Sequence, residues 1–341
     1  MRNVTKGVLV VLAVLSMSIT AAAASYDVLV PWSTLEAGSG GTTHFGAVVA
    51  GNTSFHQLRS GAAITRVDDL GGAQTSSVLM DSTAWFGATG ETSLSTWYGF
   101  GVSGDHVQFA DTTTDAIWRV HADLGTVTPY ATSGDITTLT GETSSQCLSP
   151  SDTTPSGEMA FYEGRSDSIL ITTGLNGVEY LITSAELTAA TGSDSVSGGL
   201  SFDAAGNLYW GSNSSDDLWR RATDGSLGQV LSTAEITAVT GEGAVGWKDI
   251  FAAPDGLVYF QDNTSDHILR FDPSDAAGSL EIFLSSDDLL NGPMGSNNAI
   301  SLTWFDGNLA WHAFNETPLY YVPEPTSLLL CVLGGLILRR R

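Results

Sequence analysis

The chain has 341 residues, with 37 acidic against 13 basic side chains and a formal net charge of −24. This balance disfavours nucleic-acid binding, because a phosphate backbone needs clustered lysine and arginine. The 42% of apolar residues argue against global disorder, and the 15% of charged residues and 38 glycines favour short strands joined by tight turns.

Residues 1–24 have the three-part layout of a secretion signal. A basic start (1–6) precedes an apolar stretch (7–20), and four alanines (21–24) provide a cleavage site before Ser25. A retained membrane anchor is the alternative, for which the stretch is short. The sequence therefore predicts a signal peptide over 1–24 and an exported protein at the cell surface, in the outer envelope or outside the cell.

A short apolar strand preceded by a polar turn recurs six times along the chain. Successive copies are offset by 53, 52, 49, 50 and 51 residues. Such a period is typical of β-propellers, in which each repeat is a four-stranded blade. The six copies begin at Ile64, Ile117, Ile169, Leu218, Ile268 and Leu319.

Each of these strands is followed by another strand and a capped helical turn. Thr183 with Glu186, and Ser232 with Glu235, fit the capping box, in which hydroxyl and carboxylate satisfy each other's backbone N–H groups. The matching caps elsewhere are Asp81, Thr132 and Ser285. Glycine in the left-handed conformation ends such helices, and we expect this at Gly90, Gly141, Gly192 and Gly241.

Two further strands precede each recurring strand, most clearly over residues 199–210 and 249–260, so the unit is four strands and a short helix. The last unit (300–322) has three strands only, whereas residues 26–35 match a fourth strand plus helix. The sequence therefore predicts an all-β protein. It predicts a six-bladed β-propeller over residues 25–322 that is closed by the N-terminal strand and has a helical turn after each blade. A signal helix and a short C-terminal hydrophobic helix flank it.

Two blades resemble those of six-bladed NHL-type and gluconolactonase-like propellers. The resemblance rests on residues 254–259 (Pro-Asp-Gly-Leu-Val-Tyr) and 266–272 (Asp-His-Ile-Leu-Arg-Phe-Asp). It supports the fold more than any function, because one fold hosts many activities. It also implies a central metal held by Glu, Asn and Asp side chains, a set that cannot be matched to this chain residue by residue.

The C-terminus, residues 323–341, combines three features of a sorting tail. Pro323, Glu324 and Pro325 precede an apolar run (328–338) and then the arginines 339–341. This order resembles the PEP-CTERM sorting signal, also known as the C-terminal domain of ice-binding proteins. The resemblance implies a bacterial source and processing by exosortase-type machinery during export. A plain membrane anchor is the alternative. Either way the tail contacts the membrane, with Arg339, Arg340 and Arg341 on the cytoplasmic side.

An acidic residue follows three of the helix-ending glycines, at Glu91, Glu142 and Glu242. Trp97 and Trp247 lie a few residues further on, and their rings could stack on a sugar. These five residues form a possible binding face for a cation or for sugar hydroxyls. The alternative is a set of soluble loop residues repeated by duplication.

The turns between second and third strands also repeat acidic residues. Asp111 with Asp115, and Asp262 with Asp266, faintly resemble calcium loops but lack the central glycine and the distal glutamate. An Asx-turn is the simpler interpretation. Calcium is therefore possible, and no cofactor is identified. At one position of the third strand four arginines repeat, which favours packing between blades or ion pairs: Arg66, Arg119, Arg220 and Arg270.

No catalytic residue can be assigned from the sequence, because it has no serine or cysteine nucleophile motif, no zinc spacing and no phosphate-binding glycine loop. The sequence favours a non-catalytic surface propeller that binds extracellular polysaccharide or another surface protein as a scaffold. The alternative is a metal-dependent hydrolase or lyase, lactonase-like, on the same propeller.

Overall fold

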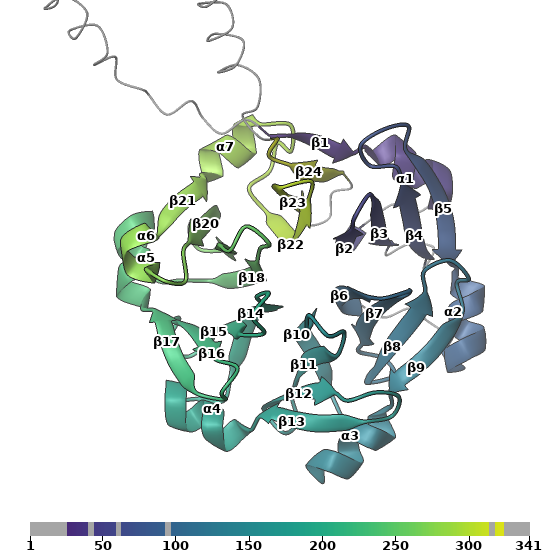
Figure 1. Ribbon diagram of the computed structural model, residues 1–341, viewed down its shortest axis with the longest axis horizontal. Coiled ribbons are helices and arrows are strands. Elements are labelled where there is room, and N and C mark those ends of the chain that lie inside the picture. The colour runs from purple at the N-terminus through teal and green to yellow at the C-terminus, as the bar shows by residue number, and fades with distance from the viewer. Residues whose placement is uncertain (1–25, 40–43, 59–62, 93–96, 314–317, 324–341) are drawn as a thin grey trace, which may run out of the picture.

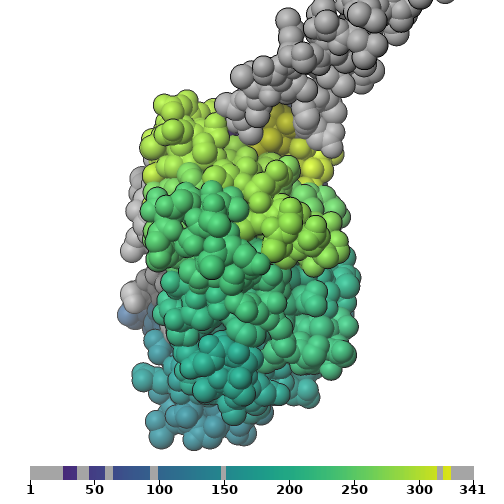
Figure 2. All heavy atoms as spheres, turned by 90° about the vertical axis from the view of Figure 1, so that its left-hand side faces the viewer, coloured from purple at the N-terminus to yellow at the C-terminus, as the bar shows by residue number. Residues whose placement is uncertain are grey.

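The computed structural model describes residues 26–39, 44–58, 63–92, 97–313 and 318–323. These residues form six four-stranded antiparallel sheets arranged as blades around a ring (Figure 1). Seen from the side, the ring is a thick disc (Figure 2). The predicted signal helix and C-terminal hydrophobic helix lie outside the described residues. Within the described part of the chain, no helix has the length and apolar character needed to cross a membrane.

The first three blades follow one another along the chain. Blade 1 comprises β2 (His44–Ala50), β3 (Thr53–Leu58), β4 (Ala63–Asp68) and β5 (Thr75–Met80). Blade 2 comprises β6 (Trp97–Ser103), β7 (His106–Asp111), β8 (Ala116–His121) and β9 (Val127–Ala131). Blade 3 comprises β10 (Cys147–Thr153), β11 (Met159–Glu163), β12 (Ser168–Thr172) and β13 (Val178–Ile182).

The last three blades complete the ring. Blade 4 comprises β14 (Val196–Phe202), β15 (Leu208–Ser212), β16 (Leu218–Arg221) and β17 (Leu227–Leu231). Blade 5 comprises β18 (Trp247–Ala252), β19 (Val258–Asp262), β20 (His267–Phe271) and β21 (Glu281–Leu284). Blade 6 comprises β22 (Ala299–Phe305), β23 (Asn308–Ala313), β24 (Leu319–Tyr321) and the N-terminal strand β1 (Asp27–Val30).

The N-terminal strand closes the ring, as the repeat count predicts. Strand β1 pairs antiparallel with β24, with Val28 opposite Tyr320 and Val30 opposite Leu319. This pairing supplies the fourth strand that the last unit lacks and covers the edge of β24. The outer edge of this blade is therefore the four-residue β1, and an edge strand this short is a poor template for another chain.

Short helices follow the outer strands and lie on the rim of the ring (Figure 1), and one more, α6, precedes the outer strand of blade 5. The predicted caps are confirmed: the side chains of Asp81, Thr132, Thr183, Ser232 and Ser285 each accept a backbone N–H of the first helical turn. The predicted helix-ending glycines all have positive φ. The helices are α1 (Trp32–Ser39), α2 (Ser82–Thr89), α3 (Ser133–Thr140), α4 (Ser184–Thr191), α5 (Thr233–Thr240), α6 (Ala276–Ser279) and α7 (Ser286–Asn291).

The hydrophobic core lies between neighbouring blades. In blades 2 to 6, one large aromatic residue of the second strand packs toward the preceding blade; Phe161, for example, clusters with Ile117 of blade 2. Its equivalents by strand register are Phe109, Trp210, Phe260 and Trp311. Blade 1 departs from this pattern, because His56 occupies the position and its ring meets that of His312 at 5.4 Å. Both histidines are fully buried.

The first strand of every blade faces the ring axis (Figure 1) and contacts the first strands of both neighbours. Each of these six strands carries a register irregularity against its second strand. A bulge bends a strand and re-aims the side chains beside it. The irregularities therefore decide which polar groups of one blade reach the next.

Candidate functional site

The three glutamates of the predicted binding face lie at the ends of three different rim helices and do not converge on one site. Glu142 and Glu242 are exposed and Glu91 is partly exposed. Each follows the glycine cap of a rim helix, and each donates its backbone N–H to a threonine hydroxyl of that helix end. Among the residues that the structure describes, no three acidic, histidine or cysteine side chains gather closely enough to hold a metal. A binding role for these glutamates stays a prediction.

The predicted aromatic part of that face needs correction. Trp247 is only 8% exposed, and its ring packs on Phe260 with 5.3 Å between centroids. Gly198 and Gly211 of blade 4 lie against it so closely that a Cβ at either position would touch the Trp247 side chain. The ring is therefore inter-blade core and is not presented to a sugar. Trp97 begins β6, and its side chain lies outside the described residues.

The acidic turns are Asx-turns, as the simpler interpretation predicts. Asp111 accepts the Thr114 backbone N–H at 2.7 Å and the Thr114 hydroxyl at 2.6 Å. Asp262 likewise accepts the backbone N–H groups of Thr264 and Ser265 and the Ser265 hydroxyl. One aspartate of each turn has left-handed backbone geometry: Asp115, Asp167, Asp216 and Asp266. Their spacing follows turn geometry, so it does not indicate calcium.

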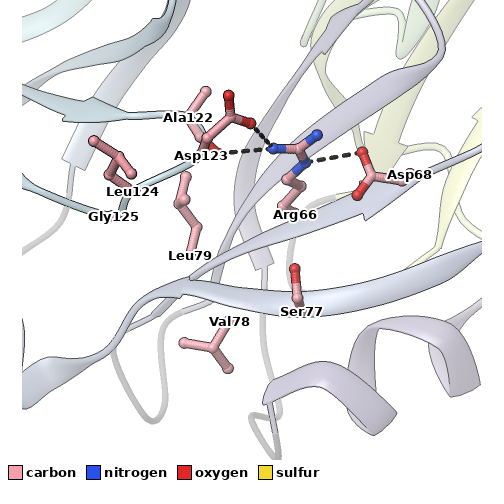
Figure 3. Close-up of a pocket in the computed structure, with 9 residues that line it drawn as sticks. All are labelled: Arg66, Asp68, Ser77, Val78, Leu79, Ala122, Asp123, Leu124 and Gly125. Carbon is pink, nitrogen blue, oxygen red and sulfur yellow. Dashed lines mark hydrogen bonds and ion pairs between the residues drawn. The ribbon is translucent and has the colours of Figure 1, made fainter.

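Arg66 lines a small hollow between blades 1 and 2 (Figure 3). Its guanidinium pairs with Asp68 on its own strand at 2.8 Å and with Asp123 of blade 2. The space measures about 230 Å³, below the usual range for ligand pockets. The predicted inter-blade ion pair is thus present at Arg66. Arg270 forms its ion pair within blade 5, with Glu281 at 2.6 Å.

Two half-buried carboxylates of the inner strands were not singled out by the sequence. Asp152 on β10 accepts the backbone N–H of Phe202 on β14 at 2.9 Å and the Ser201 hydroxyl at 3.2 Å. Asp249 on β18 accepts the backbone N–H of Leu302 on β22 at 2.6 Å. Each carboxylate also accepts the N–H of the residue that follows it. Each therefore joins the inner strand of one blade to that of the next.

Blades 3, 4 and 6 repeat one form of this contact. Asp152, Ser201 and Thr303 occupy equivalent register positions on their inner strands. Their side-chain oxygens accept the N–H groups of Phe202, Ala252 and Val49, respectively, on the next blade. The device satisfies strand-edge donors that would otherwise lack a sheet partner. Asp249 stands outside this repeat, because it follows the bulged residue Lys248.

The two inner-strand carboxyls have strongly shifted proton affinities. Burial raises the pKa of Asp152 to about 6, against the lowering effect of its hydrogen bonds. Burial raises the pKa of Asp249 to about 7, and the charge of Asp152 adds to the rise. Both carboxyls lie against β14, Asp152 through Ser201 and Phe202 and Asp249 beside Gly199. Near neutral pH, carboxyls in this range are able to accept and donate protons.

A signal for these two residues was present in the sequence, since the 50-residue period places both carboxylates where an inner strand is expected. Acidic residues are rarely buried unless paired. Their partners, however, are backbone N–H groups of the following blade, about 50 residues away along the chain. A repeat pattern predicts the strands but not which strand-edge donors face each other.

No family model matches this chain, and no curated protein matches it. Solved structures do. Virginiamycin B lyase from Staphylococcus aureus is 14% identical, with a TM-score of 0.54, over 82% of this chain and 94% of that one. A gluconolactonase from Xanthomonas campestris is 14% identical, with a TM-score of 0.53, over 86% and 93%. The calcium-binding protein regucalcin from Agrobacterium tumefaciens is 12% identical, with a TM-score of 0.53, over 83% and 90%.

These comparisons correct one expectation. The sequence favours a non-catalytic binding or scaffold role, whereas the similar propellers include a lyase and a gluconolactonase. They accord better with the alternative, a metal-dependent hydrolase or lyase on the same ring. At this level of identity the likeness itself shows the fold, so the reaction has to be argued from the residues of this chain.

Proposed function

We propose that the protein is a hydrolase or lyase that cleaves the C–O bond of an ester or lactone at the inner strands of the ring. The observation that carries the proposal is the pair of inner-strand carboxyls, Asp152 and Asp249, with pKa values raised to about 6 and about 7. Pairs of carboxyls whose environments place their pKa values near neutrality are suited to general acid–base catalysis.

The chemistry needs one group to accept a proton and the other to donate one. In hydrolysis, the ionised carboxylate takes a proton from water as the water oxygen bonds to the carbonyl carbon. The neutral carboxyl then protonates the leaving oxygen as its C–O bond breaks. In elimination, the base instead takes a proton from carbon, and a C=C bond forms as the C–O bond breaks. One carboxyl of the pair serves as the base and the other as the acid, and the two raised pKa values belong to the pair.

The described donors do not form a ligand set for a resident metal. No group of three acidic, histidine or cysteine residues converges in the described ranges. The oxygens of Asp152 and Asp249 already accept backbone N–H groups. No step is therefore assigned to a metal. Calcium stays a prediction, tested by assaying turnover and melting of the full chain before and after EDTA.

The test is turnover by the full chain on a panel of sugar and aliphatic lactones and esters. We expect Asp152→Asn and Asp249→Asn each to lower kcat/KM by about a hundredfold or more, the usual contribution of a positioned acid or base. Asp224→Asn, which changes an exposed turn carboxylate, is the matched control and should leave kcat/KM unchanged. Absence of turnover across the panel, or full activity in both inner-strand variants, would overturn the proposal.

We further propose that this reaction takes place outside the cytoplasm. The support is the sequence of residues 1–24 and 323–341, which lie outside the described residues apart from Pro323. Fractionation of cells expressing the full chain tests it. Release or surface exposure of the propeller is expected, and replacing Arg339, Arg340 and Arg341 by glutamine should alter the membrane-bound fraction. A wholly cytoplasmic protein would contradict the proposal.

A further inference from the structure

A second group of polar side chains lies between blades 5 and 6, at the bulge of β18. Trp247 pairs with Asp262 and Asp249 pairs with Gln261, so Lys248 is the extra residue of the inner strand. A bulge of this kind places two successive residues opposite one residue of the partner strand. Lys248 and Asp249 are thus set beside Gln261.

All three side chains reach the same segment of blade 6, residues 297–302. The Lys248 ammonium contacts Asn298 Oδ1. Asp249 accepts the Leu302 N–H at 2.6 Å, and Gln261 Nε2 donates to the Asn297 carbonyl at 3.3 Å. The segment is itself anchored, because Asn297 Nδ2 donates to Asp266 at 2.7 Å.

Gln261 has an acceptor that nothing described satisfies. Its side chain is 0% exposed, and its Oε1 has no hydrogen-bond donor among the described residues. A buried acceptor without a donor is costly, so such an atom indicates a place for a hydroxyl or another donor. The fold does not require a polar side chain here, because the equivalent residues are Ala110 in blade 2 and Gly211 in blade 4, although blades 1 and 6 also have polar ones, Gln57 and His312.

Lys248 is the one lysine among the described residues. The described arginines lie on the third strands β4, β8, β16 and β20 or, for Arg165, in an exposed turn. Lys248 alone places a cation on an inner strand in this part of the chain. Burial lowers its pKa, and the charge of Asp266 opposes that effect. A half-buried ammonium in a strongly acidic protein is a specific counter-charge for an anion.

From these contacts we propose that the β18 bulge forms a subsite for a small hydroxy-carboxylate. Lys248 binds the carboxylate and Gln261 Oε1 accepts a hydroxyl proton, beside the Asp249 carboxyl. The inference rests on the proposed function, whose substrate it specifies: an ester or lactone that releases or carries a hydroxy acid. An ammonium has three N–H donors, and the Asn298 contact uses one of them.

The test is calorimetric titration of the full chain with D-gluconate and with D-sorbitol, which has the same hydroxylated chain without the carboxylate. Saturable binding of gluconate and at least about tenfold weaker binding of sorbitol are expected, the usual scale for one charged hydrogen bond. Lys248→Gln should weaken gluconate binding about tenfold and Lys248→Arg should retain it. Arg165→Gln removes the same charge from an exposed turn and should change nothing.

Equal binding of the two probes, no binding of gluconate, or undiminished binding by Lys248→Gln would overturn the inference. If Lys248→Gln does not fold, the ratio of gluconate to sorbitol affinity in the unsubstituted chain decides, since the two probes differ in the carboxylate that Lys248 would bind. Binding is measured without turnover, so gluconate affinity with no hydrolysis would count against the proposed reaction alone. Hydrolysis without a preference for gluconate over sorbitol would count against the subsite alone.

Discussion

At the scale of single residues, polar groups inside the ring are tied to backbone atoms of the neighbouring blade. Asp152, Ser201 and Thr303 show the simplest case, in which one side-chain oxygen accepts one strand-edge N–H. A carboxylate in this role retains a second function, because it can also exchange a proton. Serine and threonine in the equivalent positions cannot do so near neutral pH.

The Asp152–Asp249 pair predicts a bell-shaped pH dependence of activity. Below about pH 6 the base becomes protonated, and above about pH 7 the acid loses its proton. A profile of kcat/KM between pH 4 and 9 should therefore peak between these values, which belong to the coupled pair as a whole. A kcat/KM that does not change through this range would show that Asp152 and Asp249 are not the acid and base of the reaction.

The raised pKa values of Asp152 and Asp249 also make the stability of the fold depend on pH. This dependence is opposite in direction to that of the buried histidines. In the folded state, burial holds the pKa of His312 at about 3 and that of His56 well below 6.5. The unfolded chain binds protons on these groups below about pH 6.5, so the histidines remove stability as the pH falls. Asp152 and Asp249 bind protons more tightly when folded, so between about pH 7 and 4 they restore stability.

Replacing His56 by phenylalanine separates the histidine contribution to the pH dependence of stability from that of the aspartates. Phenylalanine is the residue that blades 2, 3 and 5 use at this position, so His56→Phe should fold. When the pH is lowered from 7 to 5, the free energy of unfolding of His56→Phe should increase by about 2 kcal/mol relative to that of the unsubstituted protein. Urea titrations at both pH values measure this. His121→Gln, at a partly exposed histidine of blade 2, is the control, and an equal gain there would refute the explanation.

At the scale of elements, the short rim helices depend on their ends. In α4 and α5 the capping box is complete: Thr183 and Ser232 accept the N–H of Glu186 and Glu235, whose carboxylates accept the cap N–H in return. Helices of eight residues have little stability of their own. The caps therefore decide where each outer strand ends and the helix begins.

Thr183→Ala and Ser232→Ala should each lower the free energy of unfolding by about 1 kcal/mol, because an N-cap oxygen is lost. Thr188→Ala makes the same change on the exposed middle of α4, where alanine is the better helix former, and should not destabilise. Chemical denaturation of the three variants checks this. Similar losses at positions 183 and 188 would show that the cap is not responsible.

Helix α7 shows how a tertiary contact overrides the local pattern. It begins with a capping box at Ser285, like the others, but its terminal Gly292 has φ −85° and is not left-handed. The Tyr26 ring lies where a side chain at position 292 would be, within 2.4 Å of a Cβ. Glycine is needed here for space, because the N-terminal segment packs against the end of this helix.

At the scale of the whole molecule, Tyr26 ties the beginning of the described chain to the last blades. Its buried hydroxyl donates to the Leu289 carbonyl at 2.7 Å and accepts the Met294 N–H at 3.1 Å. Tyr26→Phe leaves both backbone groups without this partner and should lower the free energy of unfolding by about 1–3 kcal/mol. Tyr180→Phe, at a 39% exposed tyrosine, should have no such effect. Equal melting temperatures for the two variants would exclude a role in ring closure.

The ring itself was predictable from sequence, because each blade repeats the same local signals every 50 residues or so. Strand positions, caps, helix-ending glycines and the N-terminal fourth strand all follow from that period. The candidate site was not predictable in the same way. The partners of Asp152 and Asp249 depend on inter-blade register, which six irregular inner strands set individually. Trp247 was misjudged for that reason, since its ring turns toward blade 4.

Because β1 pairs with β24, the earliest and latest described strands of the chain share one sheet. During synthesis the first of these emerges long before the second, and it has no partner until all six blades have followed. Strand pairings so distant in sequence form slowly. A chain cut short before residue 319 would keep five complete sheets yet leave its N-terminal strand unpaired. Whether β1 finds β24 thus reports physically that the chain between these two strands has been made.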